Sequence, residues 1–291
     1  MPQAVAITAT PSQVIPSQAE TDNQVIGLWL AGRSAKTQRA YEADARAFLL
    51  FCGKSIKAAT VGDIQGYAMA NADKASATQA RKLSAVKSLL SFAHRIGFVA
   101  FNVGAVVKLP PIKNTLAERI TDEAAVQRLL ALTCEGRNGA ILKTIYGGGL
   151  RISEACGLKW RDLSARDDGG QATVYGKGGK TRVVILSASI WSALMALRDE
   201  AVSDAPVFRS RKGGHLDPVQ VHRIVKEAAA RAGLPAGFSA HWLRHAHASH
   251  SIDRGAPIHL VQATLGHSSV ATTGRYLHAR PTESSGKYLA V

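Results

Sequence analysis

Two adjacent prolines, Pro110 and Pro111, divide this 291-residue chain into stretches of different character. Proline lacks a backbone N–H and disfavours helix in the residue before it, so no helix can run across this point. The stretch before the prolines, about 23–108, has helical periodicity throughout, whereas the stretch after them mixes helical segments with two short β-patterned runs. The sequence therefore predicts a mainly α protein with a small β-hairpin or sheet, folded in two domains.

The predicted domain boundaries follow from this break. Residues 1–22 are rich in Ala, Thr, Ser, Gln and Pro, which predicts a flexible N-terminal tail. The ranges after it are a helical domain at 23–108, a linker at 109–115, a second domain at 116–280 and a C-terminal tail at 281–291. Within the helical domain we expect helices at 37–52, 60–68, 76–96 and 103–107.

The second domain is predicted to hold helices on both sides of a hairpin. Two β-runs, 172–176 and 181–186, are joined by Lys177-Gly178-Gly179-Lys180, which is typical of a glycine turn. The expected helices are 122–133, 137–147, 151–157, 187–200, 217–233, 240–251 and 256–264.

The charge balance favours a polyanionic partner. The chain has 36 Lys and Arg against 21 Asp and Glu, a net charge of +15 and a pI near 10.0. Nucleic acid is favoured over an anionic membrane or an acidic protein, because no long amphipathic basic helix is evident. No apolar run is long enough to span a membrane, and no signal peptide is evident. Three scattered cysteines without metal-ligand spacing fit a cytoplasmic protein.

Six residues of the second domain have the chemistry needed to break a phosphodiester bond without metal. This reaction requires a nucleophile, positive charge on the phosphoryl oxygens and a proton for the leaving oxygen. A phenol can be the nucleophile, a planar guanidinium can hold a phosphate oxygen, and a lysine at the hairpin tip can donate the proton. The six residues are Arg151, Lys177, His241, Arg244, His267 and Tyr276.

The residues around Arg151 favour a binding site for an anion. It follows three glycines, Gly147–Gly149, and begins a predicted helix whose free amides are suited to an anion. Glu154 lies three residues later on the same face and is expected to orient the guanidinium. The alternative is a loop that only requires flexibility.

Four histidines lie within ten residues of the segment 241–250. His241 and His245 share a helix face, which is compatible with a zinc pair, but no Glu lies between them and no third ligand stands out. We therefore expect His241 to act beside Arg244, His245 to be a buried structural donor, and His250 to be exposed.

The lysine turn must be distinguished from a nucleotide-binding loop. Gly179-Lys180-Thr181 is similar to the end of a P-loop, but that motif requires glycine at position 174, which is Val174. A strand rather than a helix follows. ATP binding is therefore not predicted.

Five ordered motifs of the chain resemble those of the tyrosine recombinase (phage integrase) family. They are Gly-Leu-Arg-x-Ser-Glu through Arg151, Gly-Lys-Gly through Lys177, His-x-x-Arg-His through His241, Leu-Gly-His through His267, and Thr-Thr-x-x-Tyr through Tyr276. The matched segments span 151–276, and the preceding helical region is similar in size to the family's SAM-like core-binding domain. Because the segment before that domain is short, a simple Xer-like, plasmid or transposon enzyme is expected.

The resemblance implies a site-specific recombinase that clamps duplex DNA between its two domains. Tyr276 would form a 3′-phosphotyrosyl link, and strands would be exchanged through a Holliday junction. Arg151, Arg244 and His267 would stabilise the phosphoryl charge. Lys177 would be the general acid and His241 would assist proton transfer from the phenol. Supporting residues are Glu154 and His245.

The resemblance also implies the partners. These are double-stranded DNA with an inverted-repeat core site, a homodimer on each site and a homotetramer in synapsis. A partner recombinase or an accessory protein is a further candidate, and the C-terminal tail is expected to pack on a neighbouring subunit. No cofactor, metal or membrane is expected, and localisation would be cytoplasmic and nucleoid-associated. Candidate DNA-contacting residues are Arg81, Lys82, Lys87, Lys180 and Arg182.

Two alternative functions are compatible with some of the same residues. A type IB topoisomerase uses a similar constellation to relax DNA one strand at a time, without a tetramer. A non-cutting DNA-binding relative would need neither Tyr276 nor the two arginines.

Overall fold

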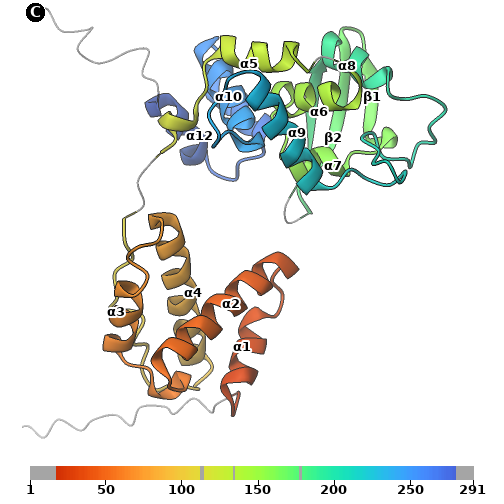
Figure 1. The fold of residues 1–291 in the computed structure, drawn as a ribbon. Coiled ribbons are helices and arrows are strands. Elements are labelled where there is room, and N and C mark those ends of the chain that lie inside the picture. The colour runs from red at the N-terminus through yellow and green to blue at the C-terminus, as the bar shows by residue number, and fades with distance from the viewer. Residues whose placement is uncertain (1–17, 112–114, 134, 177–178, 280–291) are drawn as a thin grey trace, which may run out of the picture. The chain divides into compact units, whose positions relative to one another are not determined.

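The computed structural model describes residues 18–111, 115–133, 135–176 and 179–279 and divides the chain into two compact units, 1–113 and 114–291 (Figure 1). Helices dominate both units, and the only sheet in these described ranges is a small antiparallel one. The expected fold class, mainly α with a small sheet, is therefore confirmed. Among the described residues, no helix combines the length and apolar character needed to cross a membrane.

The N-terminal unit is a helical bundle around one apolar core. Its largest fully buried side chains include Phe48, Ile56 and Leu89. Helices α2 (Ala35–Cys52) and α4 (Ser76–Arg95) pack against each other. Polar caps start the helices, since the Thr21 and Thr60 side chains both accept backbone N–H groups of the turns that they begin. The elements are α1 (Asp22–Leu30), α2 (Ala35–Cys52), η1 (Ile56–Ala58), α3 (Val61–Met69) and α4 (Ser76–Arg95).

Three details of this unit differ from the prediction. The first helix, α1, was not predicted as a separate element. The end of the predicted tail, residues 18–22, is packed: Ala19 is buried and the Gln18 N–H donates to the Ile96 carbonyl. No helix forms at 103–107, where the chain makes turns instead. Glycine and three valines in that segment favour helix weakly, and the following prolines prevent it from extending.

The C-terminal unit is built from eight α-helices and a three-stranded sheet within the described residues. The strands run in the order β1 (Leu163–Arg166), β2 (Gly169–Tyr175) and β3 (Thr181–Ser187), all antiparallel. The helices are α5 (Glu123–Ala131), α6 (Gly136–Gly147), α7 (Ile152–Gly157), α8 (Ala188–Met195), α9 (Pro218–Arg231), α10 (Ala240–Asp253), α11 (Ile258–Leu265) and α12 (Val270–Ala279). Short 3₁₀ turns, η2 (Ala117–Arg119) and η3 (Trp160–Asp162), complete the unit.

The hairpin is longer than predicted and has an extra strand. Alternate residues of β2 and β3 face the core, with Ala172, Val174, Val184 and Leu186 all buried. Strand β2 begins at Gly169, three residues before the predicted start of this run at 172. A side chain at Gly170 would collide with the Trp191 ring of α8, so this glycine lets the helix pack directly on the sheet.

Candidate active site

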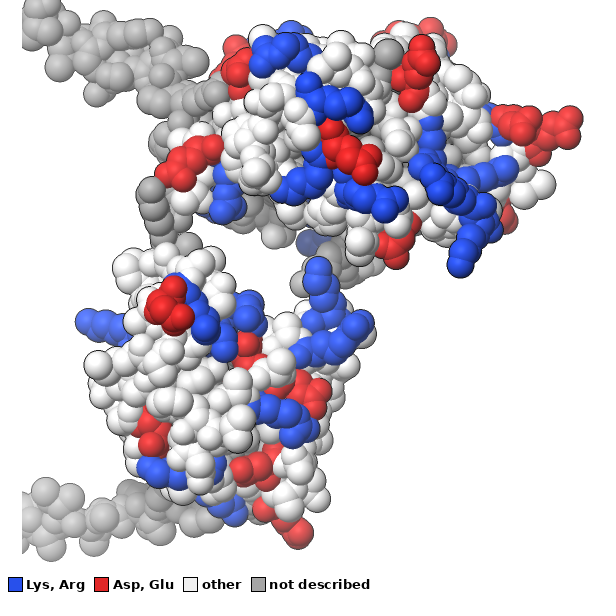
Figure 2. Space-filling view, in the orientation of Figure 1, with Lys and Arg blue, Asp and Glu red and all other residues white. Residues whose placement is uncertain are grey.

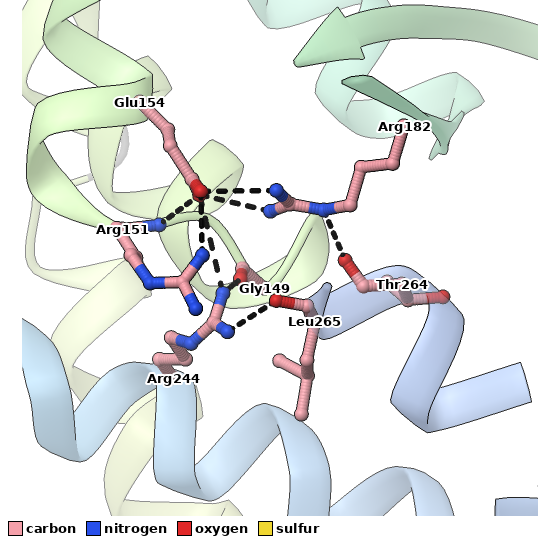
Figure 3. Close-up of polar contacts among 7 residues, drawn as sticks. All are labelled: Gly149, Arg151, Glu154, Arg182, Arg244, Thr264 and Leu265. Atoms are coloured by element: carbon pink, nitrogen blue, oxygen red, sulfur yellow. Dashed lines mark hydrogen bonds and ion pairs between the residues drawn. The ribbon is translucent and has the colours of Figure 1, made fainter. Parts of the chain in front are cut away.

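A single buried carboxylate, Glu154 of α7, lies at the centre of the candidate site (Figure 3). Its Oε1 accepts from Arg151 Nη1 at 2.7 Å and from Arg182 Nη1 at 2.9 Å. Its Oε2 accepts from Arg182 Nη2 at 2.8 Å and lies 4.0 Å from Arg244 Nη1. Three guanidiniums that are far apart in the sequence therefore converge on one negative charge. The ion pair expected between Arg151 and Glu154 is formed.

The charge on Glu154 is strongly stabilised. Burial by itself raises the pKa of this carboxyl, but the hydrogen bonds from Arg182 and Arg151 outweigh it and lower the pKa to about 2. The Arg151 backbone N–H also donates to Glu154 Oε2, at 2.8 Å. That amide had been expected to face an anionic ligand at the start of the helix; the structure shows it paired with Glu154 instead.

Arg244 and Arg182 are fixed by backbone carbonyls as well. Arg244, which is 5% exposed, donates to the Gly149 and Leu265 carbonyls, and Arg182 Nε donates to the Thr264 carbonyl at 2.7 Å (Figure 3). Arg182 therefore connects β3 to the end of α11, and Arg244 connects α10 to the same end. Arg182 had been predicted as a DNA contact, but its guanidinium is occupied by Glu154 and Thr264. Its role in the structure is to hold the carboxylate.

A cavity of about 420 Å³ opens beside these charges. The Arg151 side chain, 35% exposed, borders it, as do exposed Lys180 and the half-buried ring of His267. The cavity is lined by Arg151, Gly176, Lys180, Thr181, Arg182, Gly266, His267 and Ser268. Positive charge and hydrogen-bond donors on several sides make this space suited to a phosphate group. Lys177 lies outside the described residues, although its neighbours Gly176 and Lys180 border the cavity.

Tyr276 lies on α12, a helix that was not predicted, and its side chain is only 6% exposed. The ring packs in an apolar cluster with Leu116, Ile120, Ala248, Val261 and Leu265. Its hydroxyl is 2.8 Å from His245 Nδ1 of α10. Burial raises the pKa of this phenol, and the nearby Arg244 and Arg275 lower it by less. The hydroxyl is therefore protonated at neutral pH.

His267 and His241 occupy different surroundings. His267 Nδ1 is 2.9 Å from the hydroxyl of fully buried Thr273, and burial together with Arg244, Arg151 and Arg182 lowers its pKa to about 4. Because Nδ1 is engaged by Thr273, Nε2 is the ring nitrogen of His267 that can interact with a ligand in the cavity. His241 is exposed, and burial of part of its ring followed by the charge of Arg244 lowers its pKa.

One prediction within the histidine segment is wrong. His250, expected to be exposed, is 5% exposed and bridges the Tyr146 hydroxyl at 2.9 Å and the Thr121 carbonyl at 2.9 Å. It is the structural histidine of α10. His245, expected to be a buried structural donor, is half-buried, and its Nδ1 contacts the Tyr276 hydroxyl; a structural role for it stays a prediction. His245 lies opposite Tyr276 of α12 and His250 opposite Tyr146 of α6, and the helical period alone does not reveal these partners.

The basic candidates of the N-terminal unit all take part in contacts within that unit. Arg81 pairs with buried Asp44, Lys82 Nζ is 3.3 Å from the Tyr67 hydroxyl, and Lys87 donates to the Val107 carbonyl. Arg81 remains 45% exposed at its side chain. Figure 2 shows Lys and Arg more abundant than Asp and Glu on the visible face of each unit. Contacts of these three residues with DNA remain a prediction.

Sequence reasoning missed two residues that shape the site. Arg182 was predicted as a DNA contact, and nothing nearby in the sequence indicated its pairing with Glu154. Thr273 was quoted only as part of the motif before Tyr276. Its spacing of three residues from Tyr276 could have placed both on the inward face of a helix.

Gly149 is expected to be the least tolerant glycine of the site. Its φ is +60°, and a Cβ there would lie 2.8 Å from His247 Cδ2. Gly149→Ala should reduce the free energy of unfolding by about 1–3 kcal/mol, measured by urea unfolding, and should disturb the carbonyl that holds Arg244. Gly157→Ala is the matched control, because no atom lies within 4 Å of that position. Equal stability of the two variants would contradict this strain argument.

Comparisons with known proteins agree with this arrangement. The sequence pattern of the phage integrase family matches residues 119–283, and that of the phage integrase N-terminal SAM-like domain matches residues 25–97. Tyrosine recombinase XerC of Thermodesulfovibrio yellowstonii is 32% identical over 263 residues, covering 85% of this chain and 87% of the relative. Tyrosine recombinase XerC of Mesorhizobium japonicum is 34% identical over 268 residues, covering 84% and 85%.

Solved structures share the fold. The XerH site-specific recombinase in its post-cleavage complex with palindromic difH substrate matches with a TM-score of 0.75 and 22% identity, over 93% of this chain and 85% of that one. A lambda integrase dimer bound to a COC′ core site matches with a TM-score of 0.73 and 17% identity, over 90% and 77%.

The arginine-rich cavity and the buried Tyr276 hydroxyl together have the chemistry that cleavage of a phosphate ester by a phenol requires. The chain belongs to the phage integrase family, the tyrosine-type site-specific recombinases. The expected family and activity are therefore confirmed, and DNA relaxation and DNA binding without cleavage are not favoured.

Proposed function

We propose that this recombinase cleaves and rejoins duplex DNA through a 3′-phosphotyrosyl intermediate formed on Tyr276. The observation that supports this most directly is one buried carboxylate surrounded by three arginines, beside a cavity lined by Arg151 and His267 and close to the Tyr276 helix. Charge on the phosphoryl oxygens is the main requirement of this reaction, and rigid guanidiniums supply it without having to reorganise.

The roles proposed for the individual residues follow from their settings. Arg151 and His267 border the cavity and would contact the scissile phosphate directly. Arg244 is buried and hydrogen-bonded to backbone carbonyls. Its charge would therefore act on the same phosphate from inside the protein, without direct contact. Lys177 would protonate the leaving 5′ oxygen, and exposed Lys180 would add positive charge at the cavity rim. Glu154 keeps the three guanidiniums in position.

No metal ion or ATP is proposed as a cofactor. The covalent link to Tyr276 would retain the energy of the cleaved phosphodiester, so the free 5′ hydroxyl could attack it and restore the backbone. Other phosphoryl-transfer enzymes use Mg²⁺ to supply positive charge to the phosphate, and here the arginine side chains would supply that charge.

The proposed substrate is double-stranded DNA with an inverted-repeat core site. The net charge of +15 and the recombinase relatives support this choice. The lambda integrase structure is a dimer on a core site, and by analogy we propose a homodimer on each site here. A homotetramer in synapsis, strand exchange through a Holliday junction and an accessory or second recombinase are further parts of the proposal. The C-terminal tail proposed to join subunits, 281–291, lies outside the described residues.

The experiment that tests the proposal uses purified protein and supercoiled plasmids that carry the DNA flanking its gene, in EDTA and without ATP. The reaction is stopped with detergent, and DNA 3′ ends attached to protein are recovered and sequenced. Adducts at one inverted-repeat site support site-specific recombination. Scattered adducts with plasmid relaxation would instead indicate a topoisomerase.

Arg151→Lys should reduce the rate of adduct formation about 10²-fold or more at saturating DNA. A guanidinium can hold Glu154 with one nitrogen and a phosphate oxygen with another, whereas a lysine ammonium is a single point charge. The rate is measured in a single turnover on a DNA with a nick near the cleavage point. Arg166→Lys, on the edge strand β1, is the control. Wild-type turnover by Arg151→Lys would disprove the two-sided role of the guanidinium.

A further inference from the structure

The ring of His267 is held at one nitrogen by a buried threonine of the tyrosine helix. His267 Nδ1 is 2.9 Å from the hydroxyl oxygen of Thr273, which is fully buried. The backbone of His267 is held as well, because its N–H donates to the Gln262 carbonyl at 3.2 Å and its carbonyl accepts from the Gln262 side-chain amide at 3.1 Å. Gly266, with a φ of +62°, ends α11 and turns the chain toward α12. The imidazole therefore has a fixed position at the border of the cavity.

The surroundings of the Thr273 hydroxyl decide which of the two groups donates. A hydroxyl can both donate and accept, whereas a neutral imidazole has one N–H and one acceptor nitrogen. Among the described residues, His267 Nδ1 is the only hydrogen-bond partner of this hydroxyl. If Nδ1 carried the hydrogen, the hydroxyl hydrogen would be buried without an acceptor, which is unfavourable. The hydroxyl is therefore the donor and Nδ1 the acceptor.

This direction determines what the other ring nitrogen can do. Burial, followed by the charges of the three arginines of the site, lowers the pKa of His267 to about 4. The ring is therefore neutral at pH 7 and carries a single hydrogen. With Nδ1 accepting from Thr273, that hydrogen is on Nε2. A phosphoryl oxygen requires a donor, and the opposite tautomer would present a lone pair to it.

We propose that Thr273 is a positioning residue that fixes the tautomer of His267, so that Nε2 donates to a non-bridging oxygen of the scissile phosphate; this inference rests on the proposed function. Thr273 itself neither gains nor loses a proton. It lies three residues before Tyr276 on α12, and both side chains are buried. Packing of α12 against α11 therefore positions the nucleophile and sets the donor form of His267 together.

The tautomer can be observed in the free protein, without DNA. Histidine rings are labelled with nitrogen-15 and examined by long-range proton–nitrogen NMR at pH 7, and the His267 signals are identified by their loss in His267→Ala. Nε2 should carry the hydrogen, and Nδ1 should be an unprotonated acceptor. The reverse pattern in wild-type protein would overturn the proposal.

Thr273→Val keeps the shape of the side chain and removes the hydroxyl. The NMR signals of His267 should then show a mixture of the two tautomers, and an unchanged pattern would mean that Thr273 does not set the tautomer. Thr273→Ser restores the hydroxyl and should restore the wild-type pattern. Thr273→Ala repeats the comparison with a smaller side chain if valine at this position disturbs folding.

The same variants should differ in DNA cleavage. On the nicked DNA used for Arg151→Lys, Thr273→Val should form the covalent adduct about 10-fold more slowly than wild type, and Thr273→Ser should be close to wild type. Removal of the whole donor in His267→Ala should cost more, about 10²- to 10³-fold. Thr272→Val is the matched control, because Thr272 is the exposed neighbour on the same helix. An equal loss in Thr272→Val and Thr273→Val would contradict the role assigned to the buried hydroxyl.

A double-mutant cycle separates an effect through His267 from a general effect on α12. In the His267→Ala background, Thr273→Val should cause little further loss of rate, because the ring that Thr273 positions is absent. A 10-fold loss in both backgrounds would show that Thr273 only supports helix packing, and the proposal would be rejected. The proposed function fails in a different way, because wild-type protein would then form no Tyr276 adduct while the tautomer of His267 in the free protein stayed as described.

Discussion

Tyr276→Phe is expected to abolish formation of the covalent protein–DNA adduct, with a loss on the order of 10⁵-fold or more. The substitution removes only the hydroxyl, and the ring can keep its place in the apolar cluster around α12. DNA binding should therefore remain within a few-fold of wild type. Adduct formation is followed by denaturing gel electrophoresis of labelled DNA, and binding by fluorescence anisotropy.

Tyr175→Phe is the matched control, because it removes an exposed phenol from the same unit and should leave both measurements unchanged. An adduct formed by Tyr276→Phe at an appreciable rate would assign the nucleophile to another residue.

Glu154→Gln is expected to have the largest effect on stability, a loss of about 3–5 kcal/mol in the free energy of unfolding. The amide has nearly the shape of the carboxylate but no charge, so Arg151, Arg182 and Arg244 would face one another without a counter-ion. Its NH₂ group would also meet guanidinium donors where an oxygen had accepted. Urea unfolding measures the loss. Glu123→Gln is the control, because its pair with Arg254 lies at the surface, where ion pairs contribute less than about 1 kcal/mol.

The same residue predicts how stability depends on pH. The pKa of Glu154 falls from an ordinary value of 4.5 to about 2 on folding, so the folded state binds the proton less readily than the unfolded state. This contribution, about 3 kcal/mol, is present above pH 4.5 and is lost as the pH falls towards 2. The stability difference between wild type and Glu154→Gln should therefore shrink across this window. A difference that stays constant from pH 5 to 2 would contradict the assignment.

Loss of the same carboxylate should also slow DNA cleavage, since it holds the guanidinium that borders the cavity. Because Glu154 would act through Arg151 and Arg182, which line the cavity, and has no hydrogen bond with Tyr276 among the described residues, this effect would be indirect. It should therefore be smaller than that of Tyr276→Phe.

Local patterns in the sequence were sufficient for most helices and for the hairpin. The capped starts, the apolar period of 3.6 and the glycine turn all depend on neighbouring residues, so they can be read without the fold. Helix α12 was not predicted, because its ten residues have no acidic first turn and few large apolar side chains. Strand β1 was not predicted, because only one of its four residues is even partly buried. Packing against the rest of the C-terminal unit stabilises both.

The candidate site was predictable in its chemistry and not in its contacts. The motifs through Arg151, His241, His267 and Tyr276 determined the family, because residue types at defined spacings are properties of the sequence. Only the tertiary structure decided that Arg182 belongs to Glu154, that His250 is buried and that His245 rather than His241 meets Tyr276. These pairings join residues 28 to 129 positions apart. They depend on how β3, α10 and α12 pack together, and helical or strand periodicity contains no information on which residue of another element lies opposite.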